Sequence, residues 1–248
     1  MEQNVETLQS WIDESDNVVF FSGAGLSAES GFPDFRETDS LYYEKHKDSP
    51  DTILSRSFLL RRPFDFFKFY RERVITPLLA AAPNAAHLKL AELEQAGKLK
   101  AVITQNIDGL HQEAGSREVL ELQGSVMRSY CLRCDRFLSF FYIAESPAVI
   151  PYCNVDMCGD VVRPCMVLHE EPLDLSLLQK AAQIVQDADV LILDGTALKS
   201  FPAPNLVNYY QGKKLVLIHP TPLFFDTRAN LVIHAALSEV MGQIQVRL

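Results

Sequence analysis

The chain has 248 residues, of which 48% are hydrophobic and 22% are charged, a balance typical of a soluble globular protein with a sizeable core. Its net charge is −9 and its lysines and arginines form no cluster beyond short pairs, which argues against binding to nucleic acid or to an anionic membrane. No apolar run approaches the roughly 18 residues of a membrane span and no signal-peptide core is present, so we expect a cytoplasmic protein.

The first predicted elements are a helix over 5–15, a buried strand over 18–21 and a glycine-rich turn. Gly23, Gly25 and Ala28 have the G-x-G-x-x-G/A spacing of a dinucleotide-binding turn, where glycines let the backbone approach a pyrophosphate at a helix N-terminus. An ordinary dinucleotide fold adds a second strand with an acidic residue about 20 residues later. Residues 31–36 are Gly-Phe-Pro-Asp-Phe-Arg instead. The turn therefore predicts a modified nucleotide site rather than a hydride-transfer enzyme.

The rest of the chain alternates helical segments with short apolar strands. Helices are predicted over about 41–82, 84–95, 105–114, 179–187, 205–210 and 236–242, and strands over 101–104, 190–193, 215–218 and 231–233. This alternation predicts the α/β class, with a Rossmann-like doubly wound parallel sheet. The sheet domain would comprise 1–127 and 163–248, with a helical insertion at about 37–82.

Residues 128–162 differ from the rest because they lack helical periodicity and carry four of the five cysteines. Cys131 and Cys134 form one close pair, and Cys153 and Cys158 form a second. Four thiolates in two turns suit a tetrahedral zinc ribbon, and four sulfur ligands leave no open position for a catalytic water. We therefore predict a small module with one structural zinc ion, and we expect Cys165 to lie outside it.

Polar residues follow the strand predicted over 101–104. Gln105, Asn106 and Asp108 come where open α/β sheets bind ligands, and their side chains suit a carboxamide and ribose hydroxyls. Taken alone, such a loop does not distinguish a binding site from an ordinary polar connection.

Seven features in a fixed order identify the chain as similar to the sirtuins, the NAD-dependent protein-lysine deacylases, in their bacterial single-domain form. They are GAGLSAESGFPDFR (23–36), TQNIDGLHQEAG (104–115), ELQGS (121–125), the paired cysteines, RPCMVLHEE (163–171), GTALKSFP (195–202) and TPLFFDTRANLVI (221–233). Together they span almost the whole chain.

The resemblance implies a role for each matching position. The residues expected to bind the co-substrate NAD are Gly23, Ala24, Gly25, Ala28, Asp34, Phe35, Arg36, Gln105, Asn106, Ile107, Asp108, Gly195, Thr196, Ala197 and His219. The segment that contains Val167, His169 and Glu171 would pair with the backbone of an acylated peptide by strand addition. Gln123, Asn106 and Asp108 would form the catalytic group.

In the chemistry that the resemblance implies, the acyl-lysine oxygen attacks C1′ of the ribose as nicotinamide leaves. A base then activates a ribose hydroxyl, which takes the acyl group. The products are free lysine, nicotinamide and O-acyl-ADP-ribose. The expected partner is an acylated protein lysine, and we expect the protein to be a monomer.

The sequence departs from the family at the base. The family has a histidine in the E-L-H-G-S motif, where this chain has Gln123. Glutamine cannot hold a proton near neutral pH, and a positioned general base contributes about 10²–10⁴-fold to a rate. We therefore expect acyl transfer to be slowed far more than NAD binding or nicotinamide release. His111 belongs to another motif and is not an obvious substitute.

Four further departures lie in the same motifs. Cys165 stands where aspartate or asparagine is usual, Ala197 where serine is usual, His219 where asparagine is usual and Asp194 where glycine is common. They are consistent with sequence drift and equally with retuned or lost catalysis.

Tyr70 and Arg73 are three residues apart on a predicted helix and so share a face. They match a Tyr-x-x-Arg pair with which sirtuins that act on negatively charged acyl groups hold a carboxylate, a task that suits a guanidinium. An exposed arginine beside a core tyrosine explains the pattern equally well.

The leading hypothesis is an NAD-dependent deacylase of the deacetylase or desuccinylase type, impaired by Gln123. Two alternatives stay open: an NAD-cleaving ADP-ribosyltransferase or NAD hydrolase, and a non-catalytic module that binds NAD or acyl-lysine. Gln123 favours both alternatives, whereas the intact loops at 23–36 and 104–111 favour the deacylase and the first alternative over a binding module.

Overall fold

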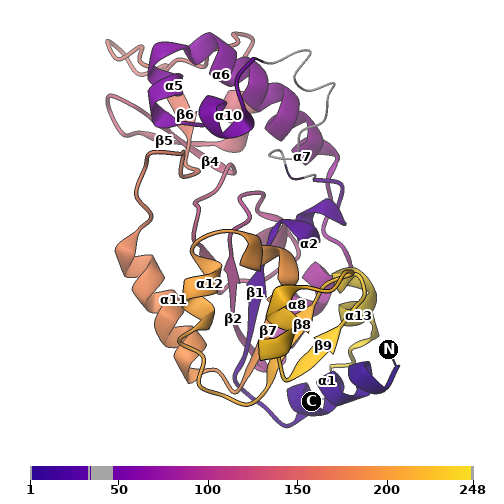
Figure 1. The fold of residues 1–248 in the computed structure, drawn as a ribbon. Coiled ribbons are helices and arrows are strands. Elements are labelled where there is room, and N and C mark those ends of the chain that lie inside the picture. The colour runs from indigo at the N-terminus through magenta and orange to yellow at the C-terminus, as the bar shows by residue number, and fades with distance from the viewer. Residues whose placement is uncertain (1, 33, 35–46, 247–248) are drawn as a thin grey trace.

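The computed structural model describes residues 2–32, 34 and 47–246. A six-stranded sheet forms the larger part of the molecule, in the order β3-β2-β1-β7-β8-β9 (Figure 1). Its strands are β1 (Val18–Ser22), β2 (Leu99–Thr104), β3 (Val119–Glu121), β7 (Val190–Asp194), β8 (Leu215–Ile218) and β9 (Leu231–Ile233). Every neighbouring pair is parallel, which confirms the predicted doubly wound sheet.

Helices cover both faces of this sheet, as the almost entirely apolar central strands require. α1 (Glu2–Asp13), α8 (Ala85–Gln95) and α13 (Leu237–Gln243) pack against one face. α11 (Leu175–Asp187) and α12 (Ala203–Val207) pack against the other. Short elements follow the strands: α2 (Ala24–Ala28) after β1, α9 (Leu110–Glu113) after β2, η2 (Gly195–Lys199) after β7 and η3 (Phe224–Arg228) after β8.

Capping side chains determine the residues at which α8 and α11 begin. The Asn84 side chain accepts hydrogen bonds from the backbone of Ala86 and His87, and His87 Nδ1 accepts one from the Asn84 backbone, so α8 begins with a capping box. Asp174 caps α11 through its side chain, and the helix begins at Leu175, four residues before the start predicted from hydrophobic spacing.

The small module lies at the carboxyl-terminal ends of the strands (Figure 1). It contains a second, antiparallel sheet, β5-β4-β6, whose short strands had not been predicted. Its strands are β4 (Arg128–Cys131), β5 (Phe137–Ser139) and β6 (Val162–Pro164). Its helices are α4 (Pro50–Ile53), α5 (Arg56–Arg61), α6 (Pro63–Tyr70), the π-helical turn η1 (Arg71–Ile75), α7 (Thr76–Ala80) and α10 (Phe140–Ala144).

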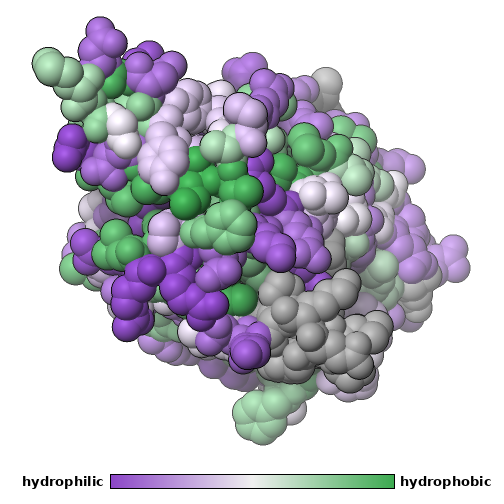
Figure 2. Space-filling view, turned by 90° about the horizontal axis from the view of Figure 1, so that it is seen from above, coloured by the Kyte–Doolittle hydropathy of each residue, from purple (hydrophilic) through white to green (hydrophobic). Residues whose placement is uncertain are grey.

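The helical insertion and the cysteine-bearing segment share one apolar core. Phe66, Phe67 and Tyr70 of α6 belong to the same buried cluster as Ile143 of α10 and Val162 of β6. Two segments that the sequence analysis separated therefore pack as a single unit. Viewed from this end, the surface has an apolar area between hydrophilic ones (Figure 2). The exposed apolar side chains of the module include Leu60, Phe64 and Phe141.

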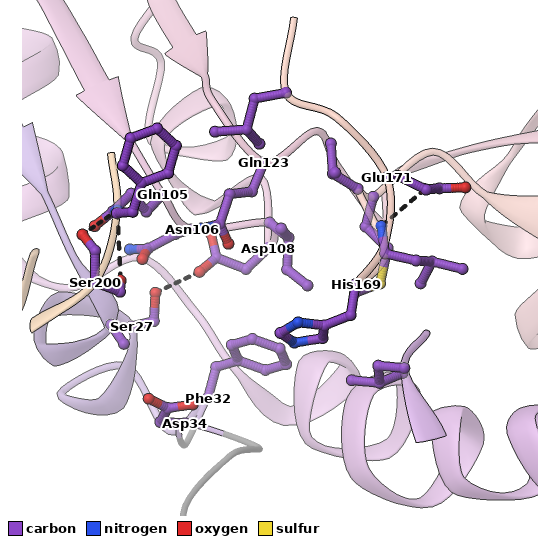
Figure 3. A pocket seen from close by; sticks show the side chains of 18 of the residues that line it. Ser27, Phe32, Asp34, Gln105, Asn106, Asp108, Gln123, His169, Glu171 and Ser200 are labelled. Atoms are coloured by element: carbon purple, nitrogen blue, oxygen red, sulfur yellow. Dashed lines mark hydrogen bonds between the residues drawn. The ribbon is translucent and has the colours of Figure 1, made fainter. Parts of the chain in front are cut away.

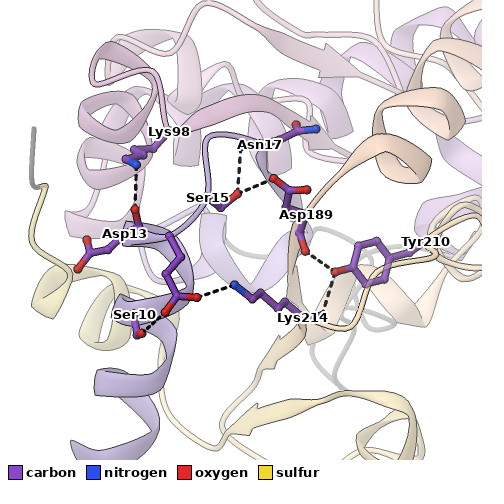
Figure 4. Close-up of polar contacts among 9 residues, drawn as sticks. Ser10, Asp13, Ser15, Asn17, Lys98, Asp189, Tyr210 and Lys214 are labelled. Atoms are coloured by element: carbon purple, nitrogen blue, oxygen red, sulfur yellow. Dashed lines mark hydrogen bonds and ion pairs between the residues drawn. The ribbon is translucent and has the colours of Figure 1, made fainter.

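At the opposite end of the large sheet, a network of polar contacts links the segments that precede β1, β7 and β8 (Figure 4). Asp189 accepts a hydrogen bond from Ser15 through its carboxylate and one from Tyr210 through its carbonyl. Lys214 pairs with Glu14 at 3.0 Å, and its backbone N–H donates to the Tyr210 hydroxyl. These contacts hold the strand starts together, away from the ligand-binding end. No helix in the described part of the chain has the length and apolar character to cross a membrane.

Candidate active site

A cavity of about 300 Å³ lies between the carboxyl-terminal ends of the central strands and the small module. Two kinds of side chain line it (Figure 3). The polar ones include Ser27, Asp34, Gln105, Asn106, Asp108 and Gln123, and the apolar ones include Phe32, Leu54, Ile107, Met166, Val167 and Leu168. The cavity thus has a hydrogen-bonding end beside an apolar wall.

The glycine-rich turn after β1 is joined to the turn after β7. A Cβ on Gly23 would lie 2.3 Å from the backbone nitrogen of Ala197, so only glycine permits this approach. Gly25 donates its backbone N–H to the Thr196 hydroxyl at 2.7 Å. The two turns that the sequence analysis assigned to NAD phosphates and ribose are therefore adjacent.

Asp194 holds these two turns in place. Its carboxylate accepts hydrogen bonds from the backbone of Gly23 (3.0 Å), Leu26 (3.2 Å) and Thr196 (2.8 Å), and from the Thr196 hydroxyl (2.7 Å). Burial raises the pKa of this carboxyl, while the four donors act in the opposite direction. Asp194 is therefore a buried anchor beneath the turns, whereas the sequence analysis had treated it only as a departure from the family.

The loop after β2 brings Asn106 and Asp108 to the cavity. Asn106 donates to the Ser22 hydroxyl at 3.2 Å and to the Gly23 carbonyl at 2.8 Å, which fixes its amide beside the glycine-rich turn. The Asp108 carboxylate accepts hydrogen bonds from the Ser27 hydroxyl and, at 2.9 Å, from the Leu110 backbone. Burial raises the pKa of Asp108.

Gln123 reaches the cavity from the connection between β3 and β4. Its carbonyl accepts a hydrogen bond from Val167 at 2.8 Å. The next residue, Gly124, has a φ of +70°, and a Cβ there would lie 2.2 Å from the Cys165 carbonyl. This close packing brings Gln123 and the segment that begins at Val167 to the same cavity as Asn106.

His111 does not lie at the cavity. Its side chain is buried, with its ring centroid 4.8 Å from that of His87 and 6.4 Å from that of Phe20. Burial, with a smaller contribution from His87, lowers the pKa of His111 well below its ordinary value. It therefore cannot stand in for a base at Gln123.

The remaining predicted residues fall into four groups. Ala24, His169 and Glu171 line the cavity, and His219 packs against Gly195, on which a Cβ would lie 2.6 Å from the His219 Cβ. Ala28 ends α2. Phe35 and Arg36 lie outside the described residues.

Tyr70 and Arg73 are not among the described residues that line the cavity. Tyr70 is completely buried and stacks on Phe66 at 6.1 Å between centroids. Burial raises the pKa of the Tyr70 hydroxyl. Tyr70 thus has the core environment that the sequence analysis gave as the alternative, and the carboxylate-binding role of this pair stays a prediction.

The sequence analysis assigned no role to several lining residues. Ser27 and Phe32 belong to the first of the seven matching motifs, so their positions gave some signal. Phe201 belongs to the matching motif at 195–202, so its position gave the same signal. Leu54 gave none, because only the packing of the small module brings it to the cavity.

The four paired cysteines form one cluster in the small module. The Sγ atoms of Cys131, Cys134, Cys153 and Cys158 all lie within 4.8 Å of one another. Tetrahedral zinc with Zn–S bonds of about 2.3 Å separates its sulfur ligands by about 3.8 Å. The cluster therefore fits the predicted structural zinc ion, and Cys165 is outside it.

Comparison with known proteins identifies the family. Residues 23–202 match the sequence model of the Sir2 family, and this range contains both turns, the polar loop, Gln123 and the four cysteines. The chain belongs to the Sir2 family. It is 47% identical to a protein of Clostridium tetani named NAD-dependent protein deacetylase, over 96% of each chain. It is 46% identical to a protein of the same name from Clostridium perfringens, over 98% of this chain and 99% of the relative.

Solved structures of Sir2 proteins have the same fold. One is a structure from work on the structural basis of sirtuin substrate affinity. It superposes on this chain with a TM-score of 0.86 at 34% identity, and the match covers 95% of this chain and 96% of that chain. Another, of Sir2 bound to an acetylated peptide, gives a TM-score of 0.82 at 33% identity, over 96% of this chain and 95% of that one. The Rossmann-like fold and the sirtuin resemblance are thereby confirmed.

Proposed function

We propose that this Sir2 protein removes acyl groups from protein lysines with NAD as co-substrate. The observation that carries the proposal is the cavity itself, where Asn106, Asp108 and Gln123 surround one end and an apolar wall leads away from it. The relatives named NAD-dependent protein deacetylase support the same activity.

The residues of the chain divide the work between two ends of the cavity. The turns at Gly23 and Thr196 would take the phosphates, since they offer closely approaching backbone and a hydroxyl. Asn106 and Asp108 would orient the nicotinamide ribose and carboxamide. Bound NAD supplies an activated ribose C1′ and a nicotinamide leaving group. The apolar wall would surround the lysine stem and exclude water from the ribose.

Gln123 limits the acyl transfer that comes after nicotinamide release. Its amide can orient a ribose hydroxyl by a hydrogen bond, but it cannot take the proton of that hydroxyl. Among the described lining residues His169 is the only histidine, and it belongs to the segment proposed to pair with the peptide backbone. We therefore propose an enzyme that binds and cleaves NAD and completes acyl transfer slowly.

The cavity favours an uncharged acyl group. Four of the described lining residues are acidic, namely Asp34, Asp108, Glu170 and Glu171, of which Glu171 is paired with an arginine outside the lining, and none of the described lining residues is lysine or arginine. Like charges would repel a succinyl carboxylate. We propose acetyl-lysine as the preferred substrate, and we retain the expectation of a cytoplasmic monomer from the sequence.

The test is to incubate the protein with NAD and an acetyl-lysine or succinyl-lysine peptide and to measure nicotinamide, deacylated peptide and O-acyl-ADP-ribose. Peptide-dependent nicotinamide release with slow deacetylation is expected. Nicotinamide release without peptide would instead support the second candidate, an NAD hydrolase or ADP-ribosyltransferase, which Gln123 favours. An absence of any NAD turnover would overturn the proposal in favour of a binding module.

A further inference from the structure

The segment 167–171 is attached to the start of α5 through its backbone. His169 donates its N–H to the Leu54 carbonyl at 3.0 Å, and its own carbonyl accepts the Arg56 N–H at 3.0 Å. These bonds make a parallel bridge between Ser55 and His169. The proposed peptide-binding segment is thus paired with the helical part of the small module.

Glu170 occupies a backbone conformation that favours glycine. Its φ is +74°, in the left-handed region, where a side chain is sterically disfavoured. The Glu170 carboxylate accepts hydrogen bonds from the Ser57 backbone N–H at 2.9 Å and from the Ser57 hydroxyl at 2.8 Å. The same contacts with Ser57 lower the pKa of Glu170. The side chain therefore compensates for the conformation that the backbone adopts.

The other end of the segment is fixed as well. Val167 donates to the Gln123 carbonyl at 2.8 Å, and Leu168 donates to the Glu171 carboxylate at 2.9 Å. Glu171 in turn pairs with Arg163, which is buried. Both ends are held, and the Glu170–Ser57 contact adds a side-chain link beside the backbone bridge of His169 in the middle of the segment.

We infer that Glu170 and Ser57 are positioning residues that hold segment 167–171 ready for strand addition by the acylated peptide. The inference rests on the proposed function and names residues through which the peptide would be recognised. A preordered segment spares the peptide the entropic cost of ordering it, and this saving appears as affinity.

The decisive variant is Glu170→Gly. Glycine adopts the left-handed conformation without strain, so the fold is retained, but the bonds to Ser57 are lost. We expect the Kd for an acetyl-lysine peptide to rise roughly tenfold, since two hydrogen bonds to a charged group are removed. The Kd for NAD should stay unchanged. In the ligand-free protein, the amides of Leu168 and His169 should exchange their hydrogens faster.

Three further variants separate positioning from other roles. Glu170→Gln keeps an acceptor for the Ser57 N–H and should restore most of the peptide affinity. Ser57→Ala removes only the hydroxyl contact and should have a smaller effect than Glu170→Gly. Ser10→Ala breaks a serine–glutamate hydrogen bond of the same length, 2.8 Å, on the distant helix α1 and should change neither measurement.

Unchanged amide exchange and unchanged peptide affinity in Glu170→Gly would overturn the inference. Equal losses in Glu170→Gln and Glu170→Gly would also overturn it, because the charge itself would then contact the peptide. A wild-type protein that binds no acetyl-lysine peptide would refute the proposed function instead. In that case amide exchange, which needs no ligand, still shows whether Glu170 orders the segment.

Discussion

Gln123 and Val167 are joined by a backbone hydrogen bond of 2.8 Å between the Val167 N–H and the Gln123 carbonyl. Gln123 stands where the resemblance to the sirtuins places the family's base, and Val167 begins the segment proposed to hold the peptide. One short contact therefore fixes the spacing between Gln123 and the segment proposed to hold the peptide. Because this contact uses backbone atoms, a substitution of the Gln123 side chain leaves it intact.

The substitution Gln123→His should therefore restore the missing base without moving the peptide segment. We expect the deacetylation rate to rise about 10²–10³-fold, within the usual range for a positioned general base. The Kd for NAD should change by less than about twofold, since binding does not depend on proton transfer. Steady-state assays of deacetylated peptide and calorimetric titration with NAD measure the two quantities. A rate that does not rise would show that Gln123 is not the limiting position.

Removing the Asp194 carboxylate should weaken NAD binding. In Asp194→Ala, the backbone N–H groups of Gly23 and Leu26 lose their buried acceptor, and each unsatisfied donor costs about 1–3 kcal/mol. We expect a lower melting temperature and at least a tenfold higher Kd for NAD, because both turns lose their common anchor. Asp187→Ala, at the exposed end of α11, is the matched control. Undiminished NAD affinity in a folded Asp194→Ala protein would contradict the anchoring role.

The buried pair His87 and His111 should make the protein less stable in mild acid. Burial lowers the pKa of His87 to about 4 and that of His111 well below its ordinary value. Both side chains are neutral when folded, but in the unfolded chain they take up protons below about pH 6.5. The unfolded state then binds more protons, so the free energy of unfolding falls as the pH decreases from about 6.5 to 4.

Urea unfolding at several pH values measures this slope. His111→Phe should flatten it, because an aromatic ring remains but one titrating group is gone. His234→Gln changes a partly exposed histidine and serves as the control. An equally steep slope in the His111→Phe protein would locate the acid sensitivity elsewhere.

Removal of zinc should unfold the small module. The four sulfur atoms lie within 4.8 Å of one another, so without the ion four cysteine side chains would be crowded together with no metal ion to coordinate. We expect about one zinc ion per chain by metal analysis, and we expect chelation to lower the melting temperature and abolish peptide binding. Cys131→Ser should lose the metal, whereas Cys165→Ser should keep it. A folded wild-type protein without zinc would refute the metal site.

Several features could be predicted from local pattern alone. The apolar runs predicted β1, β2, β7, β8 and β9, because strands buried on both faces must be continuously hydrophobic. The cysteine spacing predicted the metal cluster, since each pair lies within one short turn. Gln105, Asn106 and Asp108 were predicted to reach the site because they directly follow a strand, and strand ends in a parallel sheet meet at one edge.

Other features depend on contacts between residues far apart in the chain. The sequence showed Asp194 as an unusual residue, but only the structure places its carboxylate beneath Gly23, 171 positions away. The burial of His111 and the bonds from Glu170 to Ser57 likewise arise from packing between segments. Hydrophobic periodicity and residue spacing report the local conformation of a segment, and they therefore predicted the strands and the metal ligands, whereas the resemblance of seven sequence features to the sirtuins predicted the family. The packing of the segments decides which side chains anchor the turns, which line the cavity and which lie away from it. Only the tertiary structure determined these positions.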